Sequence, residues 1–535
     1  MNMKAFLRLT FFIPFIAISM VGCSGGTPSG TKGSGQELSI NITTEPQTLD
    51  PRKVRSLNDT NVTRMFMEGL TRTDKNGSII LAAAESMELS EDQRVYTFKL
   101  RKAEWSNGDP VTSKDFAYAW KKCLSPSFLS PNANLLYVIQ NAREARNGTL
   151  PLSLVGIETP NDATLVVTLS HPTPYFLDLI AHPVYFPVNR KVDQQNAHWA
   201  ENESTYVGNG PFSLAEWKHQ NAITAVKNPT YWDQKAVKLS KIHLSMVSED
   251  TGFKIFEHHE SDWDGSPFST IPLDAIKSLM ETNLLQTSPA LATNFIRVNV
   301  KKTLLESKEF RRALAYAIDR KAIVEHVLQG RQIPATGIVP KALNLCHEGY
   351  FTDANIEEAR LLFLEASQKM GFKVDKVPEL VLTYASGERP HVTAQAIQSQ
   401  WKEALGIDVR LEPLERRVYF DRVSKQDYML ALGDWFADFE DPINFLEVFT
   451  KDAGTNNTNW DHPCFGELLD NSYHAKSAQE RNMLLRRSEE LLMSEMPVIP
   501  MYHYTFLHVQ DKSLKNVVLT SMGNIDFKWA YVDRK

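Results

Sequence analysis

The sequence predicts a mixed α/β protein built of more than one lobe. Along the chain the hydrophobic pattern switches between a period of two and a period of 3.6, as strands and amphipathic helices require. The hydrophobic and charged fractions, 42% and 23%, are those of an ordinary globular protein and exclude a disordered chain. A body of roughly 500 residues exceeds what one hydrophobic core usually serves, so two or three lobes are expected.

Three segments predict strands. Their side chains alternate between apolar and polar, which is typical of a strand with one buried face. The segments are residues 37–43 (ELSINIT), 95–101 (VYTFKLR) and 164–170 (TLVVTLS).

Two segments predict helices. Residues 307–330 begin with Ser307, which can cap a helix, and end at Gly330, which can stop one. Residues 353–370 carry a second apolar stripe. The stripe of the first helix comprises Phe310, Leu314, Ala317, Ile318, Val324 and Leu328, and that of the second Ile356, Ala359, Leu362, Phe363 and Ala366.

The N-terminus predicts export and attachment to a membrane. Residues 1–22 place two basic residues ahead of an apolar run that is too short for a comfortable membrane span, which is typical of a secretory signal. The end of this run, Val21-Gly22-Cys23, resembles the bacterial lipobox, which implies a lipidated Cys23. Residues 23–35 then form a small, polar tether. An ordinary cleaved signal or an uncleaved anchor is the alternative.

Charge and cysteine content argue against several classes of protein. Removal of the signal takes the formal net charge from -6 to -8, and no basic stripe favours nucleic acid. No second run of about 20 apolar residues follows the signal. Cys123, Cys346 and Cys464 lack metal-ligand spacing, and at most one disulfide, of open pairing, can form among them. We expect no metal site, cofactor or catalytic residue.

Residues 433–442, GDWFADFEDP, hold the most informative cluster of charge. Four carboxylates stand among three large aromatic residues, and burial of an unpaired carboxylate beside such rings is costly. Asp441-Pro442 is typical of a helix start, while Asp434 and Glu440 are expected to face solvent. The stretch therefore predicts a bound cation near this cluster of acids.

Several long motifs resemble one family. They are TEPQTLDPRKV (44–54), MFMEGLTRTDKNG (65–77), YTFKLRKAEWSNGDPVTSKDFAYAW (96–120), VGNGPFSLAEWK (207–218) and FRRALAYAIDRKAIVEHVLQG (310–330). In this order they resemble the periplasmic oligopeptide-binding proteins of bacterial ABC importers. The resemblance implies an α/β, periplasmic-binding-protein type II fold with three lobes and a hinged ligand cleft. Its implied lobes are I (36–67, 190–291 and 507–535), II (68–189) and III (292–506).

The resemblance also implies a ligand site. Asp438, three residues after Trp435, matches the carboxylate that pairs with the peptide's α-ammonium group. Strands at Arg55 to Leu57 and at Asp434 to Phe436 are expected to pair with the ligand backbone. The cavity is expected to be lined by Asn209, Tyr137 and Tyr504.

Four positions depart from the family. Leu432 stands where well-known members place an arginine for the C-terminal carboxylate of a short peptide. Arg55 and Arg297 replace acidic residues, and Arg416 replaces tryptophan. Two interpretations stay open: the arginines form salt bridges or point outward, or they favour acidic peptides or murein tripeptides.

The function predicted first is that of a lipid-anchored receptor in the periplasm or at the cell surface. It would capture short peptides as a monomer without catalysis and deliver them to an ABC transporter permease. A receptor for murein tripeptides in cell-wall recycling is the alternative. An exported hydrolase using paired acids from residues 434–441, or a surface adhesin, would belong to other classes. Peptide preference, the membrane concerned and the permease stay open.

Overall fold

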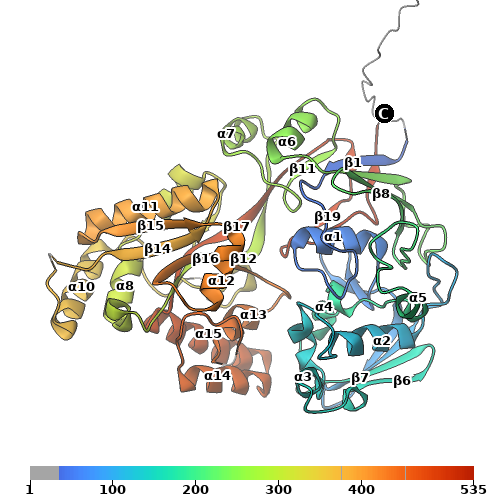
Figure 1. The fold of residues 1–535 in the computed structure, drawn as a ribbon, viewed down its shortest axis with the longest axis horizontal. Helices are drawn as coiled ribbons and strands as arrows, with labels where there is room; N and C mark the ends of the chain where they lie inside the picture. Colours follow the sequence, from blue (N-terminus) through green and yellow to red (C-terminus); the bar gives the residue numbers. More distant parts are fainter. Residues whose placement is uncertain (1–34, 347, 375, 452, 535) are drawn as a thin grey trace, which may run out of the picture. The chain divides into compact units, whose positions relative to one another are not determined.

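A mixed sheet of eleven strands runs through the computed structural model, which describes residues 35–346, 348–374, 376–451 and 453–534 (Figure 1). Its strand order is β15-β14-β16-β12-β17-β11-β1-β10-β9-β8, with β13 beside β17. The bounds are β1 Glu37–Asn41, β8 Phe212–Lys218, β9 Ala222–Lys227, β10 Lys241–Ser245, β11 Trp263–Gly265, β12 Gln286–Val298, β13 Ile333–Pro334, β14 Leu380–Ala385, β15 Val409–Leu414, β16 Leu430–Phe436 and β17 Val498–Gln510.

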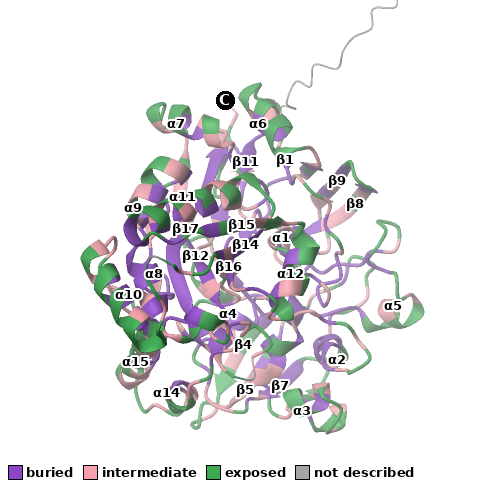
Figure 2. Cartoon of the chain, turned by 60° about the vertical axis from the view of Figure 1, so that its left-hand side comes forward, coloured by how far each residue is buried: buried purple, intermediate pink, exposed green. Residues whose placement is uncertain are grey.

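Two long strands join the two ends of this sheet. β12 and β17 have 13 residues each and pair antiparallel with each other. At its C-terminal end, residues 508–510, β17 also pairs with β11. Residues 292–298 of β12 also pair with β16. The ladders of β1 with β10 and β11, and of β14 with β15 and β16, are parallel. In Figure 2 the buried residues concentrate on these central strands.

A separate antiparallel sheet has the order β4-β5-β7-β6. Its strands are β4 Ala84–Leu89, β5 Val95–Leu100, β6 Ile157–Asn161 and β7 Thr164–Thr168. The three predicted strands are confirmed as β1, β5 and β7, each ending one or two residues early. Three small pairs are β2 Thr71–Thr73 with β3 Ile79–Leu81, β18 Leu514–Lys515 with β21 Tyr531–Val532, and β19 Val518–Leu519 with β20 Ile525–Asp526.

The helices lie between the strands in sequence. The α-helices are α1 Leu57–Phe66, α2 Ser113–Cys123, α3 Ala142–Arg146, α4 Phe176–Leu179, α5 Arg190–Gln195, α6 Glu249–Glu257, α7 Leu273–Glu281, α8 Lys308–Tyr316, α9 Arg320–Ala322, α10 Ile356–Met370, α11 Glu388–Leu405, α12 Arg416–Ser424, α13 Ile443–Leu446, α14 Pro463–Tyr473 and α15 Ala478–Glu495. The short 3-10 helices are η1 Ala133–Val138, η2 Leu152–Leu154, η3 Pro183–Tyr185, η4 Thr303–Glu306, η6 Lys341–Leu343 and η7 Glu447–Phe449, and η5 Ile323–Leu328 is π-helical.

The continuous helix predicted over 307–330 is wrong. Ser307 does cap α8, because its side chain accepts the N–H of Phe310. The chain then leaves the helix after α8, and Asp319 accepts the N–H of Ala322 to start α9, which continues as η5. An aspartate inside an apolar stripe can thus cap a new helix instead of continuing the first. The second prediction is confirmed as α10, with Asn355 as its N-cap and Gly371 as its left-handed C-cap.

Two large hydrophobic cores stabilise the described residues. One surrounds the four-stranded sheet and also takes in α13 to α15. The other lies where α8, α10 and α11 cover β14, β16 and β17. In it Trp401 is fully buried and its indole N–H donates to the Leu314 carbonyl at 2.8 Å. A large buried aromatic side chain typically stabilises the fold by about 1.5–3 kcal/mol.

Several expectations concern residues 1–34, including Cys23, and lie outside the described residues. Within the described ranges, no helix has the length and hydrophobicity that spanning a membrane requires. Cys123, Cys346 and Cys464 are free thiols. The described part of the chain also holds no group of three or more His, Cys, Asp and Glu residues suited to a metal ion. The described residues form one compact unit.

Candidate ligand-binding site

The end of β16 offers an unpaired strand edge. Asp434, Trp435 and Phe436 pair with residues 292–294 of β12 on one side. On the other side, the ladder with β14 reaches only to Ala431. The N–H of Ala437 donates to Leu291 of β12, so strand alternation turns the backbone groups of Asp434 and Phe436 toward the other edge. The edge beside Asp434 and Phe436 can therefore accept an added strand.

Asp434, Phe436 and Tyr504 form one group beside this edge. The Phe436 and Tyr504 rings are 5.1 Å apart, and the Tyr504 hydroxyl lies 3.5 Å from Asp434 Oδ2. Phe436 is 41% exposed and Asp434 is exposed as well. Nevertheless, surrounding protein raises the pKa of both Asp434 and Tyr504 by desolvation.

Trp435 lies on the opposite face of β16. Its indole N–H donates to Asn444 Oδ1 at 3.0 Å, and the same oxygen accepts the N–H of Asp438 at 3.2 Å. Trp435 also packs against the first hydrophobic core. In this arrangement Trp435 positions the segment that carries Asp438.

Asp438 is the carboxylate without a cation. It is partly buried, and desolvation raises its pKa to about 6, an increase that a hydrogen bond with Asn444 partly offsets. Within the described ranges no Lys, Arg or His lies within 4.0 Å of it. Desolvation together with the negative charge of Asp438 raises the pKa of Glu447 to about 7. An ammonium group placed here would relieve both carboxylates.

Asp441 shows the opposite arrangement three residues later. Arg481 of α15 donates to both of its oxygens at 2.8 Å. Asp441 also accepts the N–H of Ile443 at 2.9 Å, but the N-cap of α13 is Pro442, and the helix begins one residue later than predicted. Its charge is therefore already neutralised by the protein.

Two of the three predicted arginines lie near Asp434. Their positive charges, in Arg297 and Arg416, offset part of the rise in the pKa of Asp434. The Nη2 atom of Arg297 is 3.3 Å from the Asp434 carbonyl oxygen. Arg416 is the first residue of α12, with its guanidinium 5.5 Å from the Phe420 ring. Among the described residues neither arginine has a carboxylate within 4.0 Å.

The strand predicted at Arg55 to Leu57 is wrong. Ser56 is the N-cap of α1 and Leu57 its first residue, because Ser56 and Asp59 form a reciprocal capping box. Arg55 is exposed, and its side chain has no hydrogen bond to the described residues. Leu57 packs near Phe506.

Asn209 and Tyr137, the other two predicted cavity residues, have contacts within the protein, and their place in the ligand cavity stays a prediction. Asn209 is buried, and its side-chain amide bonds both the N–H and the carbonyl of Glu68, each at 2.9 Å. Its polar atoms thus hold the backbone of the protein in this arrangement. Tyr137 is partly buried in η1, with the Arg143 guanidinium 5.2 Å from its ring.

A second set of contacts joins the segment after β16 to α4. The Phe439 ring stacks on Tyr175 at 4.2 Å, and the N–H of Glu440 donates to Asp178 at 2.6 Å. Desolvation raises the pKa of Asp178 to about 6. The sequence analysis did not predict Tyr175, Asp178 or Glu447. Each of them comes close to the segment after β16 only in the folded chain.

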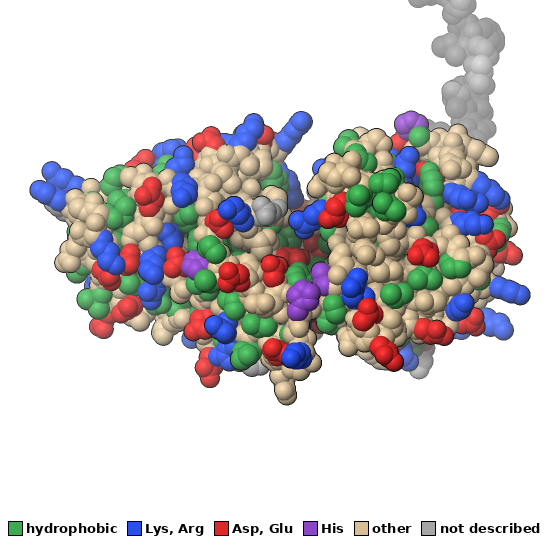
Figure 3. Space-filling view, turned by 90° about the horizontal axis from the view of Figure 1, so that it is seen from below, with side chains coloured by type: hydrophobic (Ala, Val, Ile, Leu, Met, Phe, Trp, Pro, Cys, Tyr) green, Lys and Arg blue, Asp and Glu red, His purple; other side chains and the backbone are tan. Residues whose placement is uncertain are grey.

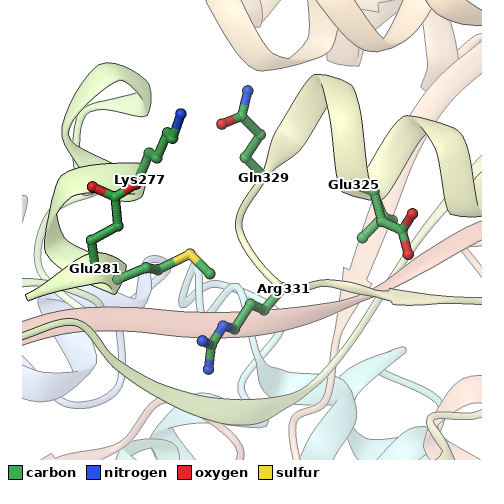
Figure 4. A pocket seen from close by; sticks show the side chains of 7 residues that line it. Lys277, Glu281, Glu325, Gln329 and Arg331 are labelled. Carbon is green, nitrogen blue, oxygen red and sulfur yellow. The ribbon is translucent and has the colours of Figure 1, made fainter. Parts of the chain in front are cut away.

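The distribution of surface charge is mixed. On the face shown in Figure 3, Lys and Arg side chains are interspersed with Asp and Glu, and the surface is hollowed near its middle. A distinct pocket of about 400 Å³ lies between α7 and η5. Its lining includes Lys277 and Glu281 from α7 and, beyond them, Glu325, Gln329 and Arg331 (Figure 4). It contains none of the predicted site residues, and its own cations and acids balance.

Comparison with known proteins identifies the relatives of this chain. Residues 78–457 match the model of the bacterial extracellular solute-binding proteins, family 5, middle region. The oligopeptide-binding protein OppA of Bacillus subtilis is 38% identical, over 99% of each chain. Two solved structures match 94% of this chain at 27% identity. Haemophilus influenzae OppA in complex with RPPGFSPFR has a TM-score of 0.81, with 100% of that chain covered. The Escherichia coli murein tripeptide-binding protein MppA has a TM-score of 0.82, with 99% of that chain covered.

Proposed function

Because the chain belongs to family 5 of the bacterial extracellular solute-binding proteins, we propose that it captures oligopeptides outside the cytoplasm and delivers them to an ABC transporter permease. One observation carries the proposal: Asp438 is a desolvated carboxylate with no cation beside it among the described residues. A free peptide carries an α-ammonium group at neutral pH. A charge-assisted hydrogen bond to it contributes about 1.5–3 kcal/mol.

The strand edge explains how many peptide sequences could be held. Asp434 and Phe436 offer backbone groups on a free edge, and backbone pairing does not depend on the ligand's side chains. A peptide added here would begin at Asp438 and run antiparallel to β16. The relatives support this reading, since OppA of Haemophilus influenzae is seen in complex with a peptide.

The proposal includes attachment through a lipid on Cys23, which places a monomeric receptor in the periplasm or on the cell surface. It also includes the three lobes as bounded above, hinged where β12 and β17 cross between the ends of the large sheet. We propose no enzymatic activity. The pairing of Asp441 with Arg481 argues against the use of that acid as a catalytic base.

A murein tripeptide is the second candidate ligand, and a specific observation favours it. Arg297 and Arg416 lie near the strand edge without a carboxylate within 4.0 Å among the described residues. A ligand with more carboxylates than an ordinary peptide would complement them. The similarity to the murein tripeptide-binding protein MppA supports this candidate.

Native mass spectrometry tests the proposed function. The chain without residues 1–35 and its Asp438→Asn variant would be purified without denaturation, with Glu440→Gln as a control that removes an exposed acid from the same segment. We expect a series of peptide masses on the parent and the control, and few or none on Asp438→Asn. One dominant tripeptide mass would select murein peptide. A product smaller than the added peptide would indicate a hydrolase, and an unoccupied parent protein would refute peptide capture.

A further inference from the structure

We infer that Tyr175 and Asp178 position the segment that carries Asp438 and thereby set how strongly the protein recognises an ammonium group. Tyr175 is the N-cap of α4, and Asp178 lies within this helix. The inference rests on the proposed function, because the ammonium group is that of the proposed peptide ligand. It assigns the two residues a positioning role, in which they act on the ligand through Asp438.

Residues close in sequence hold the peptide group before Asp438. The N–H of Asp438 donates to Asn444 Oδ1 at 3.2 Å, and this oxygen also accepts the indole N–H of Trp435. Two dihedral angles, one on each side of the Cα atom, define the backbone at a residue, and the direction of the side chain depends on both. The contact with Asn444 restrains only the first angle. The direction of the Asp438 carboxylate therefore also depends on the residues that follow.

Helix α4 and its N-cap hold the residues after Asp438. The Phe439 ring stacks on the Tyr175 ring, with the centroids 4.2 Å and the planes 7° apart, and both side chains are buried. The N–H of Glu440 donates to Asp178 Oδ2 at 2.6 Å, from 262 positions away. These contacts fix the side chain of the next residue and the peptide group beyond it. They therefore restrain the second backbone angle of Asp438.

The Asp178 carboxylate makes one hydrogen bond, and this bond is to the segment after β16. The carboxylate is partly buried, and desolvation raises its pKa to about 6, which leaves it mostly ionised at neutral pH. Within the described ranges it accepts no other hydrogen bond and has no cation within 4.0 Å. A backbone N–H forms a stronger hydrogen bond with an ionised carboxylate than with a neutral oxygen. The bond between Asp178 and Glu440 is thus suited to hold the segment in place.

The residues before α4 also reach the surroundings of the second desolvated acid, Glu447. The His171 ring lies 4.0 Å from the Tyr473 ring, and the Tyr473 hydroxyl donates to Glu447 Oε2 at 3.3 Å. Desolvation and then the charge of Asp438 raise the pKa of Glu447, so the two acids influence each other. Residues 171–178 therefore support both of the acids beside which the ammonium group is proposed to bind.

Calorimetry with two synthetic peptides tests the positioning role. The peptides are tetra-alanine amide, which has a free ammonium group, and its N-acetylated form, which has none. Both would be titrated into the ligand-stripped protein and into the variants Asp178→Ala, Asp178→Asn, Tyr175→Ala and Tyr175→Phe. Glu440→Gln is the matched control, because it changes an exposed side chain of the segment and keeps the backbone N–H that Asp178 accepts.

For the parent protein and the control we expect acetylation to weaken binding about tenfold or more, the value of one charge-assisted hydrogen bond. In Asp178→Ala and Tyr175→Ala this preference should fall to about threefold or less, while the acetylated peptide keeps its affinity. Asp178→Asn retains an oxygen that can accept the N–H, and Tyr175→Phe retains the ring. Both should therefore keep the preference within about twofold of the parent's value. If Tyr175→Ala does not fold, Asp178→Ala carries the test, because Asp178 is only partly buried.

Three results would overturn the positioning role. In the first, Asp178→Ala keeps the full preference for the free ammonium group. In the second, Asp178→Asn loses the preference as completely as Asp178→Ala, which would mean that the charge of Asp178 acts on the ligand directly. In the third, Asp178→Ala weakens both peptides equally. Failure of the proposed function is a different result, because the parent protein itself would then bind neither peptide or show no preference between them.

Discussion

The two ends of the free edge of β16 differ in the sign of their charged side chains and in which of those charges have a partner within the protein. At one end Asp438 and Glu447 are desolvated acids with raised pKa values and no cation within 4.0 Å among the described residues. At the other, Arg297 and Arg416 lie near Asp434, and two cations share one acid. A few residues away, Asp441 and Arg481 satisfy each other completely. The protein can therefore pair a charge of this segment internally, whereas Asp438 has no cation within 4.0 Å among the described residues.

The largest expected effect is on the stability of the ligand-free protein at the Asp438 end. The pKa of Asp438 in the folded state, about 6, exceeds the ordinary 3.8, so ionisation destabilises the fold above pH 6 and has no such effect below pH 4. Asp438→Asn should therefore raise the free energy of unfolding by about 2 kcal/mol at pH 8. Urea unfolding at pH 8 and at pH 4 measures this difference. A variant equally stabilised at both pH values, or destabilised at pH 8, would contradict it.

The pH dependence of peptide binding tests the same end with ligand present. Only the ionised Asp438 attracts an ammonium group, and its pKa is about 6. Affinity should therefore fall about tenfold between pH 7 and pH 5, as the ionised fraction does. Titration of tetra-alanine amide across this range isolates the Asp438 end, because that peptide has no carboxylate. In Asp438→Asn the remaining affinity should not follow this curve.

At the arginine end, Gly433→Ala should displace Arg297 without changing any charge. The added methyl group would overlap Arg297 Nη1, which is the end of a flexible side chain and can move. We expect about fivefold weaker binding of tetra-alanine, no change for its amide, and a loss of less than about 1 kcal/mol in stability. Calorimetry and urea unfolding measure the two quantities. Equal weakening of both peptides would instead indicate general damage to the edge.

The smallest effect is expected from Trp435→Phe. The substitution keeps an aromatic ring in the core but removes the indole hydrogen bond to Asn444, which also holds the N–H of Asp438. Looser positioning of Asp438 should weaken acid and amide peptides alike by about threefold. A loss confined to the acid form would mean that Trp435 acts at the arginine end instead. Calorimetry with the same peptide pair distinguishes the two results.

The sequence by itself determined the features that depend on neighbouring residues. The period of the hydrophobic pattern located β1, β5, β7 and α10, and Ser307 was recognised as a helix cap. The acids of residues 433–442 and their aromatic neighbours were also visible. These features follow from local backbone geometry and from the cost of burying charge, both of which short stretches of sequence express.

Only the tertiary structure decided which charges are already paired. Asp441 meets Arg481 from 40 positions away, and Asn209 meets the backbone of Glu68 from 141 positions away. The structure also placed Trp435 on the face of β16 opposite Asp434, and made Leu57 the first residue of α1. Such pairings arise when distant strands and helices pack together, and many partners of like chemistry compete for each charge. Spacing along the chain therefore could not select among them, whereas the folded backbone allows one arrangement.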